Sequence, residues 1–155
     1  MISSSRLILF SVCALMASHI RADESYVCAT EFAGGLVFDA GTKKWHGGAF
    51  QPDAKYVISN SQGDDGEART ERVVRNAGEK EISYWCEKDF NETGYLFCRN
   101  AFGVFRFNKQ NLRFMSTYMV GYVTDGIQNS GGLENKEGDN TPIIRGGVCS
   151  PAVAR

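Results

Sequence analysis

The chain has 155 residues, of which 43% are hydrophobic and 23% charged, with 17 glycines and only three prolines. This composition excludes a disordered or collagen-like chain and is typical of one compact domain. Lys and Arg total 17 and Asp and Glu total 18, so no overall positive charge draws the chain to nucleic acid or to an anionic membrane.

The first 22 residues have the pattern of a secretory signal. Arg6 precedes an apolar run of eleven residues, 7–17, which suits the hydrophobic region of a signal peptide and is too short to span a bilayer. Ala22 is a small residue suited to the position before the cleavage site. We therefore predict a signal peptide over 1–22, a single β domain over 23–155 without a transmembrane segment, and a periplasmic or secreted location. Loss of the signal would take the net charge from −1 to −3.

Four cysteines follow the predicted signal, and an even number in an exported chain is typical of two disulfides. Three pairings are formally open. A hairpin centred on Glu92 would place Cys86 directly opposite Cys98, within the Cα separation that a disulfide requires. This geometry favours that pair and leaves Cys28 to join Cys149, tying the first strand of the domain to the last.

Signals for β-strands are dense and helical periodicity is nearly absent, which predicts an all-β fold, a small antiparallel β-barrel or sandwich with two disulfides. Gly34 and Gly35 predict a bulge or bend within 33–35. The segment 69–75 is polar and is predicted as an edge strand. The segment 112–123 is apolar on both faces beyond Arg113, as expected of a covered central strand or one lining a barrel. Strands are expected, in chain order, over 25–32, 36–39, 44–50, 55–59, 69–75, 81–86, 95–99, 102–107, 112–123, 141–144 and 147–149.

No residue set in the sequence supports a specific catalytic mechanism. His46 is the sole histidine of the predicted domain, no G-x-S-x-G is present, and the cysteines are expected to be paired, so nucleophilic catalysis lacks a base. No C-x-x-C spacing indicates zinc, and we expect neither a metal nor a cofactor. A carboxylate-based hydrolase stays open as an alternative, although nothing places two of the candidate carboxylates in one cleft: Glu31, Asp39, Glu81 and Glu87.

The segment 100–107 partly matches an RNA-reading motif, through Phe102, Gly103 and Phe107. Predicted export, disulfides and negative charge argue against nucleic acid. We instead predict a binding domain without catalytic activity, whose partner is an unknown envelope protein or a small apolar ligand. A filled interior with exposed aromatic side chains would favour a protein, whereas an aromatic barrel interior would favour the small ligand. The expected lining of that interior is Phe105, Phe107, Tyr118 and Tyr122.

Three segments, 26–28, 107–122 and 140–149, resemble small exported proteins of alphaproteobacteria that have no assigned activity. This resemblance implies a periplasmic or secreted location. The triplet Tyr26-Val27-Cys28 is also similar to the start of the periplasmic inhibitors of C-type lysozyme, which are small disulfide-tied barrels. Their S-G-x-x-Y loop is missing, because Ser130-Gly131 is followed by Gly132-Leu133-Glu134, so a lysozyme-inhibitor function is kept only as an alternative. Lipocalins are similar in size and strand content, but their early G-x-W is absent.

Overall fold

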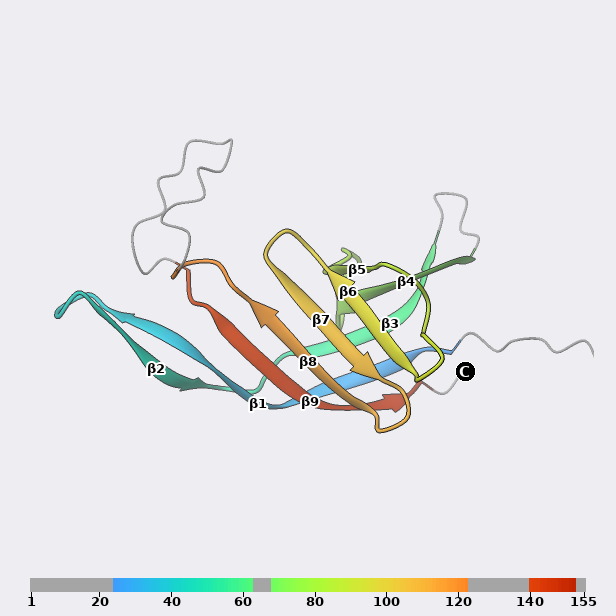
Figure 1. The fold of residues 1–155 in the computed structure, drawn as a ribbon, viewed down its shortest axis with the longest axis horizontal. Helices are drawn as coiled ribbons and strands as arrows, with labels where there is room; N and C mark the ends of the chain where they lie inside the picture. The colour runs from blue at the N-terminus through green and yellow to red at the C-terminus, as the bar shows by residue number, and fades with distance from the viewer. Residues whose placement is uncertain (1–23, 63–67, 123–139, 153–155) are drawn as a thin grey trace, which may run out of the picture.

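The computed structural model describes residues 24–62, 68–122 and 140–152 (Figure 1). Within these ranges the regular structure is entirely β, and no helix there is long and apolar enough to cross a membrane. The predicted signal over 1–22 and the segments 63–67 and 123–139 lie outside the described residues. The nine strands are β1 (Tyr26–Asp39), β2 (Lys44–Phe50), β3 (Lys55–Gln62), β4 (Ala68–Asn76), β5 (Tyr84–Cys86), β6 (Tyr95–Arg99), β7 (Gly103–Asn108), β8 (Arg113–Tyr118) and β9 (Ile143–Pro151).

Eight of these strands close into an antiparallel barrel. Each strand from β3 to β8 pairs with its successor, β3 pairs with β1, and β9 pairs back with β1. The remaining strand, β2, pairs only with the second half of β1, from Ala33↔Phe50 to Asp39↔Lys44. The β1–β2 hairpin therefore projects from the ring, as the left side of Figure 1 shows. The prediction of an all-β fold, a small antiparallel barrel or sandwich, is confirmed, and of these two architectures the structure has the barrel.

Both predicted disulfides are present. Cys86 and Cys98 are register partners in β5 and β6, which is the arrangement expected from the hairpin between them. Cys28 and Cys149 are register partners in β1 and β9. The second bond therefore crosslinks the seam at which the first strand of the barrel meets the last.

The bend predicted at 33–35 is wrong in position. The register between β1 and β9 shifts earlier, between Thr30 and Phe32, and β1 then continues as one strand to Asp39. Gly147 explains why the register shifts at this position. It lies opposite Thr30, and a Cβ on it would come within 2.1 Å of the Ala29 carbonyl oxygen. The missing side chain lets β1 approach β9 closely where β1 changes its other partner from β3 to β2.

Two further predictions about strands are corrected. The segment predicted as a polar edge strand is β4, which pairs with β3 and β5 and buries Arg72, Val73 and Val74. The segment predicted over 112–123 is a strand only over β8, which ends at Tyr118. Its alternate residues face the barrel interior while Met115 is exposed on the outside, so it lines a barrel and is not covered on both faces.

Aromatic side chains fill the middle of the barrel. Phe105 stacks on Phe114 with ring centroids 5.3 Å apart, and Tyr56 packs edge-on against Phe105 at the same distance. Towards one end, Tyr26 packs against Phe107 with centroids 4.7 Å apart. This packing leaves no open channel through the middle of the described barrel and restricts any ligand site to its ends or its outer surface.

Candidate functional site: the open end of the barrel

A cavity of about 950 Å³ lies at the end of the barrel where β3 and β9 begin and β4 and β8 end. Its walls carry both polar and apolar side chains, contributed by strands and by the connections between them. The apolar part of the wall includes Phe50, Ala54, Ala77 and Ile143. Such a volume is within the range usual for small-molecule sites.

Hydroxyl groups form the inner end of this cavity. Tyr56 and Tyr84 are buried and line it, and the Tyr56 hydroxyl lies 3.3 Å from the Ser116 hydroxyl. Phe105 packs against both tyrosine rings, with centroids 5.3 and 5.7 Å away, and separates the cavity from the deeper core. Burial, with a smaller contribution from Tyr56, raises the pKa of Tyr84 to about 12, so this phenol is a neutral hydrogen-bond donor at neutral pH.

The cavity wall carries two cations, Lys55 and Arg145. Lys55 is exposed at the start of β3, so the inward one is Arg145. It lies on the same face of β9 as Cys149, and so points into the barrel, where it is the register partner of Ser116. Its charge acts on Tyr84, whose pKa it tends to lower. The Nε atom of Arg145 is buried and has no hydrogen-bond partner within the described ranges. None of the three ion pairs found among the described residues involves it.

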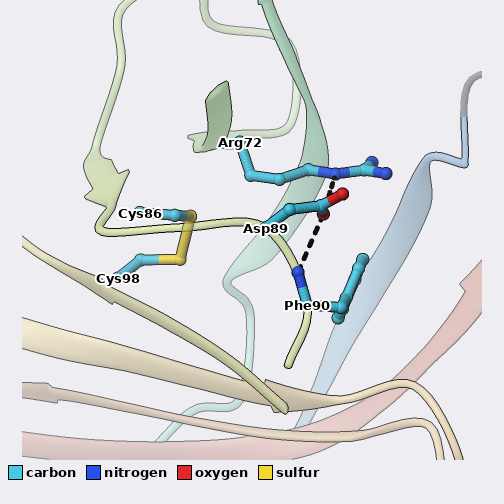
Figure 2. The surroundings of a disulfide bond; sticks show 5 residues. All are labelled: Arg72, Cys86, Asp89, Phe90 and Cys98. Carbon is cyan, nitrogen blue, oxygen red and sulfur yellow. Dashed lines mark hydrogen bonds and ion pairs between the residues drawn. A yellow bond between two sulfur atoms is a disulfide. The ribbon is translucent and has the colours of Figure 1, made fainter. Parts of the chain in front are cut away.

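The opposite end of the barrel is closed by a second inward arginine, Arg72, whose side chain is only 6% exposed. Its Nε donates to Asp89 Oδ1 at 3.0 Å, and another nitrogen donates to the carbonyl of Glu24. Its guanidinium also lies 5.2 Å from the ring centre of Phe90. Figure 2 shows Asp89 between Arg72 and the backbone N–H of Phe90, close to the Cys86–Cys98 disulfide. This buried charge therefore has a carboxylate, a carbonyl and an aromatic ring as partners.

Two carboxylates of the closed end have lowered pKa values. Burial tends to raise the pKa of Asp89, but the Phe90 N–H and Arg72 outweigh it and lower the pKa. Burial also tends to raise the pKa of Glu24. The hydrogen bonds that Glu24 accepts from Tyr26 at 2.5 Å and from Lys109 at 3.1 Å outweigh burial, and the pKa is lowered. Both groups are thus held as carboxylates around the two cations.

The four side chains predicted to line a ligand site do not share one cavity. Phe105 and Phe107 are completely or almost completely buried in the aromatic core. Tyr118 does line the open-end cavity, and its hydroxyl donates to Asn140 Oδ1 at 3.1 Å. Tyr122 is 55% exposed and packs against Trp45 of β2. They separate because β7 sends its phenylalanines to the centre, whereas β8 ends at Tyr118 before Tyr122 is reached.

Two of the residues weighed for catalysis, His46 and Asp39, lie on the β1–β2 hairpin. His46 is exposed on β2, with Nδ1 3.2 Å from the Gly47 carbonyl oxygen. Asp39 ends β1 and accepts from the Thr42 and Gly41 N–H groups, which lower its pKa. In the described part of the chain, no group of three or more His, Cys, Asp or Glu side chains is placed to hold a metal ion.

An exposed row crosses the outer surface over β6, β7 and β8. Phe97, Arg106 and Met115 are consecutive register partners, and the Arg106 guanidinium lies 4.8 Å from the Phe97 ring centre. Phe97 is 39% and Met115 48% exposed. Within the RNA-like segment, Arg106 therefore belongs to this outer row and Phe102 is exposed elsewhere, whereas Phe105 and Phe107 point inwards.

Sequence reasoning missed Tyr56, Tyr84 and Arg145, three of the polar residues that line the cavity. Arg145 is in phase with the disulfide-bonded Cys149 and so shares its face of β9. The predicted strands 141–144 and 147–149 left Arg145 between them, which hid this relationship. Comparison with known proteins found that no protein-family model, no curated protein and no solved structure matches this chain.

Proposed function

We propose that this chain is an exported binding domain that takes a small ligand into the cavity at the open end of its barrel and carries out no chemistry on it. The observation that carries this proposal is the convergence of two buried tyrosines and Arg145 on a cavity of about 950 Å³. A concave site with apolar walls and a few convergent polar groups is the usual form of a small-molecule site.

Two disulfides support export, because such bonds form and persist in oxidising compartments. The test is the localisation and thiol content of the full chain expressed in a bacterial host. We expect the protein in the periplasmic fraction, with no free thiol after denaturation and removal of the signal. Recovery in the cytosol with four reactive thiols in the domain would contradict export.

The ligand is proposed to be amphipathic, which revises the expected purely apolar ligand. Phe105 and Phe107 pack against other core side chains and offer no open surface to a ligand. The cavity wall instead combines Phe50 and Ile143 with tyrosine hydroxyls and a guanidinium. A molecule with one polar end and one apolar part would match both kinds of surface.

The test is native mass spectrometry after incubation with a bacterial small-molecule extract. Ala77→Trp would place an indole at the cavity, whereas Ala29→Trp adds the same side chain at an exposed position on β1, outside the cavity. We expect a one-to-one adduct on the wild type and on Ala29→Trp, and its loss from Ala77→Trp. The absence of any adduct, or equal adducts on all three proteins, would reject the proposed site.

An acidic partner protein is the second candidate, favoured by the exposed row of Phe97, Arg106 and Met115. The only charge in this row is positive, so the partner would complement it with carboxylates. Capture of such a partner should be lost in Arg106→Glu and retained in Ala77→Trp. Capture that Ala77→Trp abolishes and Arg106→Glu leaves unchanged would reject this surface.

A further inference from the structure

The two inward arginines of the barrel differ in how their charge is compensated. Burying a guanidinium is costly unless hydrogen bonds and opposite charge replace the lost water. Arg72 has a carboxylate, a carbonyl and an aromatic ring as partners. Arg145 has a buried Nε without a hydrogen-bond partner among the described residues, and it lines a cavity without forming an ion pair there.

We propose that Arg145 binds the carboxylate of the ligand, and that the ligand is a monocarboxylate with an apolar tail. This inference rests on the proposed function and specifies its ligand class. The planar fork of a guanidinium matches the two oxygens of a carboxylate and donates charge-assisted hydrogen bonds to them. The ligand would supply to Arg145 the kind of partner that Asp89 supplies to Arg72.

The surroundings of Arg145 suit a single negative charge. Tyr84 remains protonated and, with the hydroxyls of Tyr56 and Ser116, provides neutral donors close to the guanidinium. Such donors stabilise an anion without adding charge of their own.

The side chains around these polar groups restrict the charge of the ligand and the chemistry of its tail. Asp53 and Glu79 also line the cavity and offset the charges of Lys55 and Arg145, so the lining has no excess positive charge to hold a doubly charged group such as phosphate. Phe50 and Ile143 offer apolar surface to a hydrocarbon or aromatic tail. The geometry thus favours a carboxylate over a phosphate and a tailed acid over acetate.

The experiment compares linear and phenyl-substituted monocarboxylates of four to twelve carbons with their primary amides, by calorimetry on the full chain recovered without its signal. Inorganic phosphate is titrated as a further probe. We expect at least one acid to bind the wild type about tenfold or more tightly than its amide. Arg145→Met should remove this difference, Arg145→Lys should keep part of it, and Arg113→Met, which changes an exposed arginine on β8, should leave it unchanged.

A second measurement covers the case in which Arg145→Met fails to fold. In the wild type, the acid should shift one arginine Nε–H signal in a nitrogen–proton correlation spectrum, and the amide should not. Acids and amides that bind equally well at the cavity would overturn the carboxylate inference and leave the proposed function standing. If neither the panel nor the bacterial extract yields a bound molecule, both the carboxylate inference and the proposed function are rejected. Phosphate that binds more tightly than every acid would also overturn the inference.

Discussion

Arg72 and Asp89 form an ion pair of 3.0 Å across the closed end of the barrel, with the arginine side chain buried and the aspartate side chain 54% exposed. Asp89→Asn would leave the buried guanidinium without its carboxylate. We expect a loss of about 1–2 kcal/mol in the free energy of unfolding, between the values typical of exposed and of buried pairs. The measurement is urea unfolding at pH 7.

The control for this prediction is the exposed pair of Glu87 and Arg99, whose atoms lie 3.3 Å apart. Glu87→Gln should cost about 0.5 kcal/mol or less, because both side chains are largely solvated. Equal losses in the free energy of unfolding of the two variants would show that burial of Arg72 does not increase the contribution of its ion pair to stability.

Stability should fall in acid because of the closed end. The folded-state pKa values of Asp89 and Glu24 are below their ordinary values of 3.8 and 4.5. The unfolded chain therefore takes up protons first as the pH falls, and the stabilisation, complete above about pH 5, is lost as the pH drops through the lowered values. Urea unfolding from pH 7 to pH 2 should show this decline, with a flatter profile for Asp89→Asn. Parallel profiles would contradict the assignment to Asp89.

Local patterns in the sequence were sufficient to predict the all-β fold and both disulfides, but not to decide between a barrel and a sandwich. Cys86 and Cys98 flank a turn and become register partners through hairpin geometry alone. The polar segment containing Arg72 was misread as an edge because its partner, Asp89, lies in a connection 17 residues away whose path is set by tertiary packing. Arg145 was not predicted as a site residue for a related reason, since its importance comes from the cavity it faces and not from its neighbours in sequence.

The two disulfides should differ in their contribution to stability. The Cys28–Cys149 bond spans 121 residues and the Cys86–Cys98 bond spans 12. On the loop-entropy model, the longer loop contributes about 5 kcal/mol and the shorter about 3 kcal/mol. Replacing Cys28 and Cys149 by alanine should therefore lower the denaturant midpoint more than the same change at Cys86 and Cys98. The reverse order would indicate that the β5–β6 hairpin, and not the β1–β9 seam, limits stability.

Phe105 should contribute to stability through packing. It is fully buried and stacks on Phe114, so Phe105→Ala should cost about 3–5 kcal/mol through lost burial and the cavity left behind. Phe97→Ala removes the same side chain from the exposed row and should cost about 1 kcal/mol or less. Thermal unfolding of the two variants makes the comparison, and similar losses would argue that Phe105 is not in a close-packed core.

Gly147 tests the explanation for the irregularity in β1. Gly147→Ala would bring a Cβ within 2.1 Å of the Ala29 carbonyl oxygen, and a backbone atom inside a paired strand cannot move aside as a side-chain end can. We expect a loss of about 2 kcal/mol or more in the free energy of unfolding. Gly47→Ala is the control, because nothing lies within 4 Å of the added methyl, and it should leave stability unchanged or slightly higher. If Gly147→Ala is as stable as Gly47→Ala, the close approach of β1 to β9 does not depend on the missing side chain.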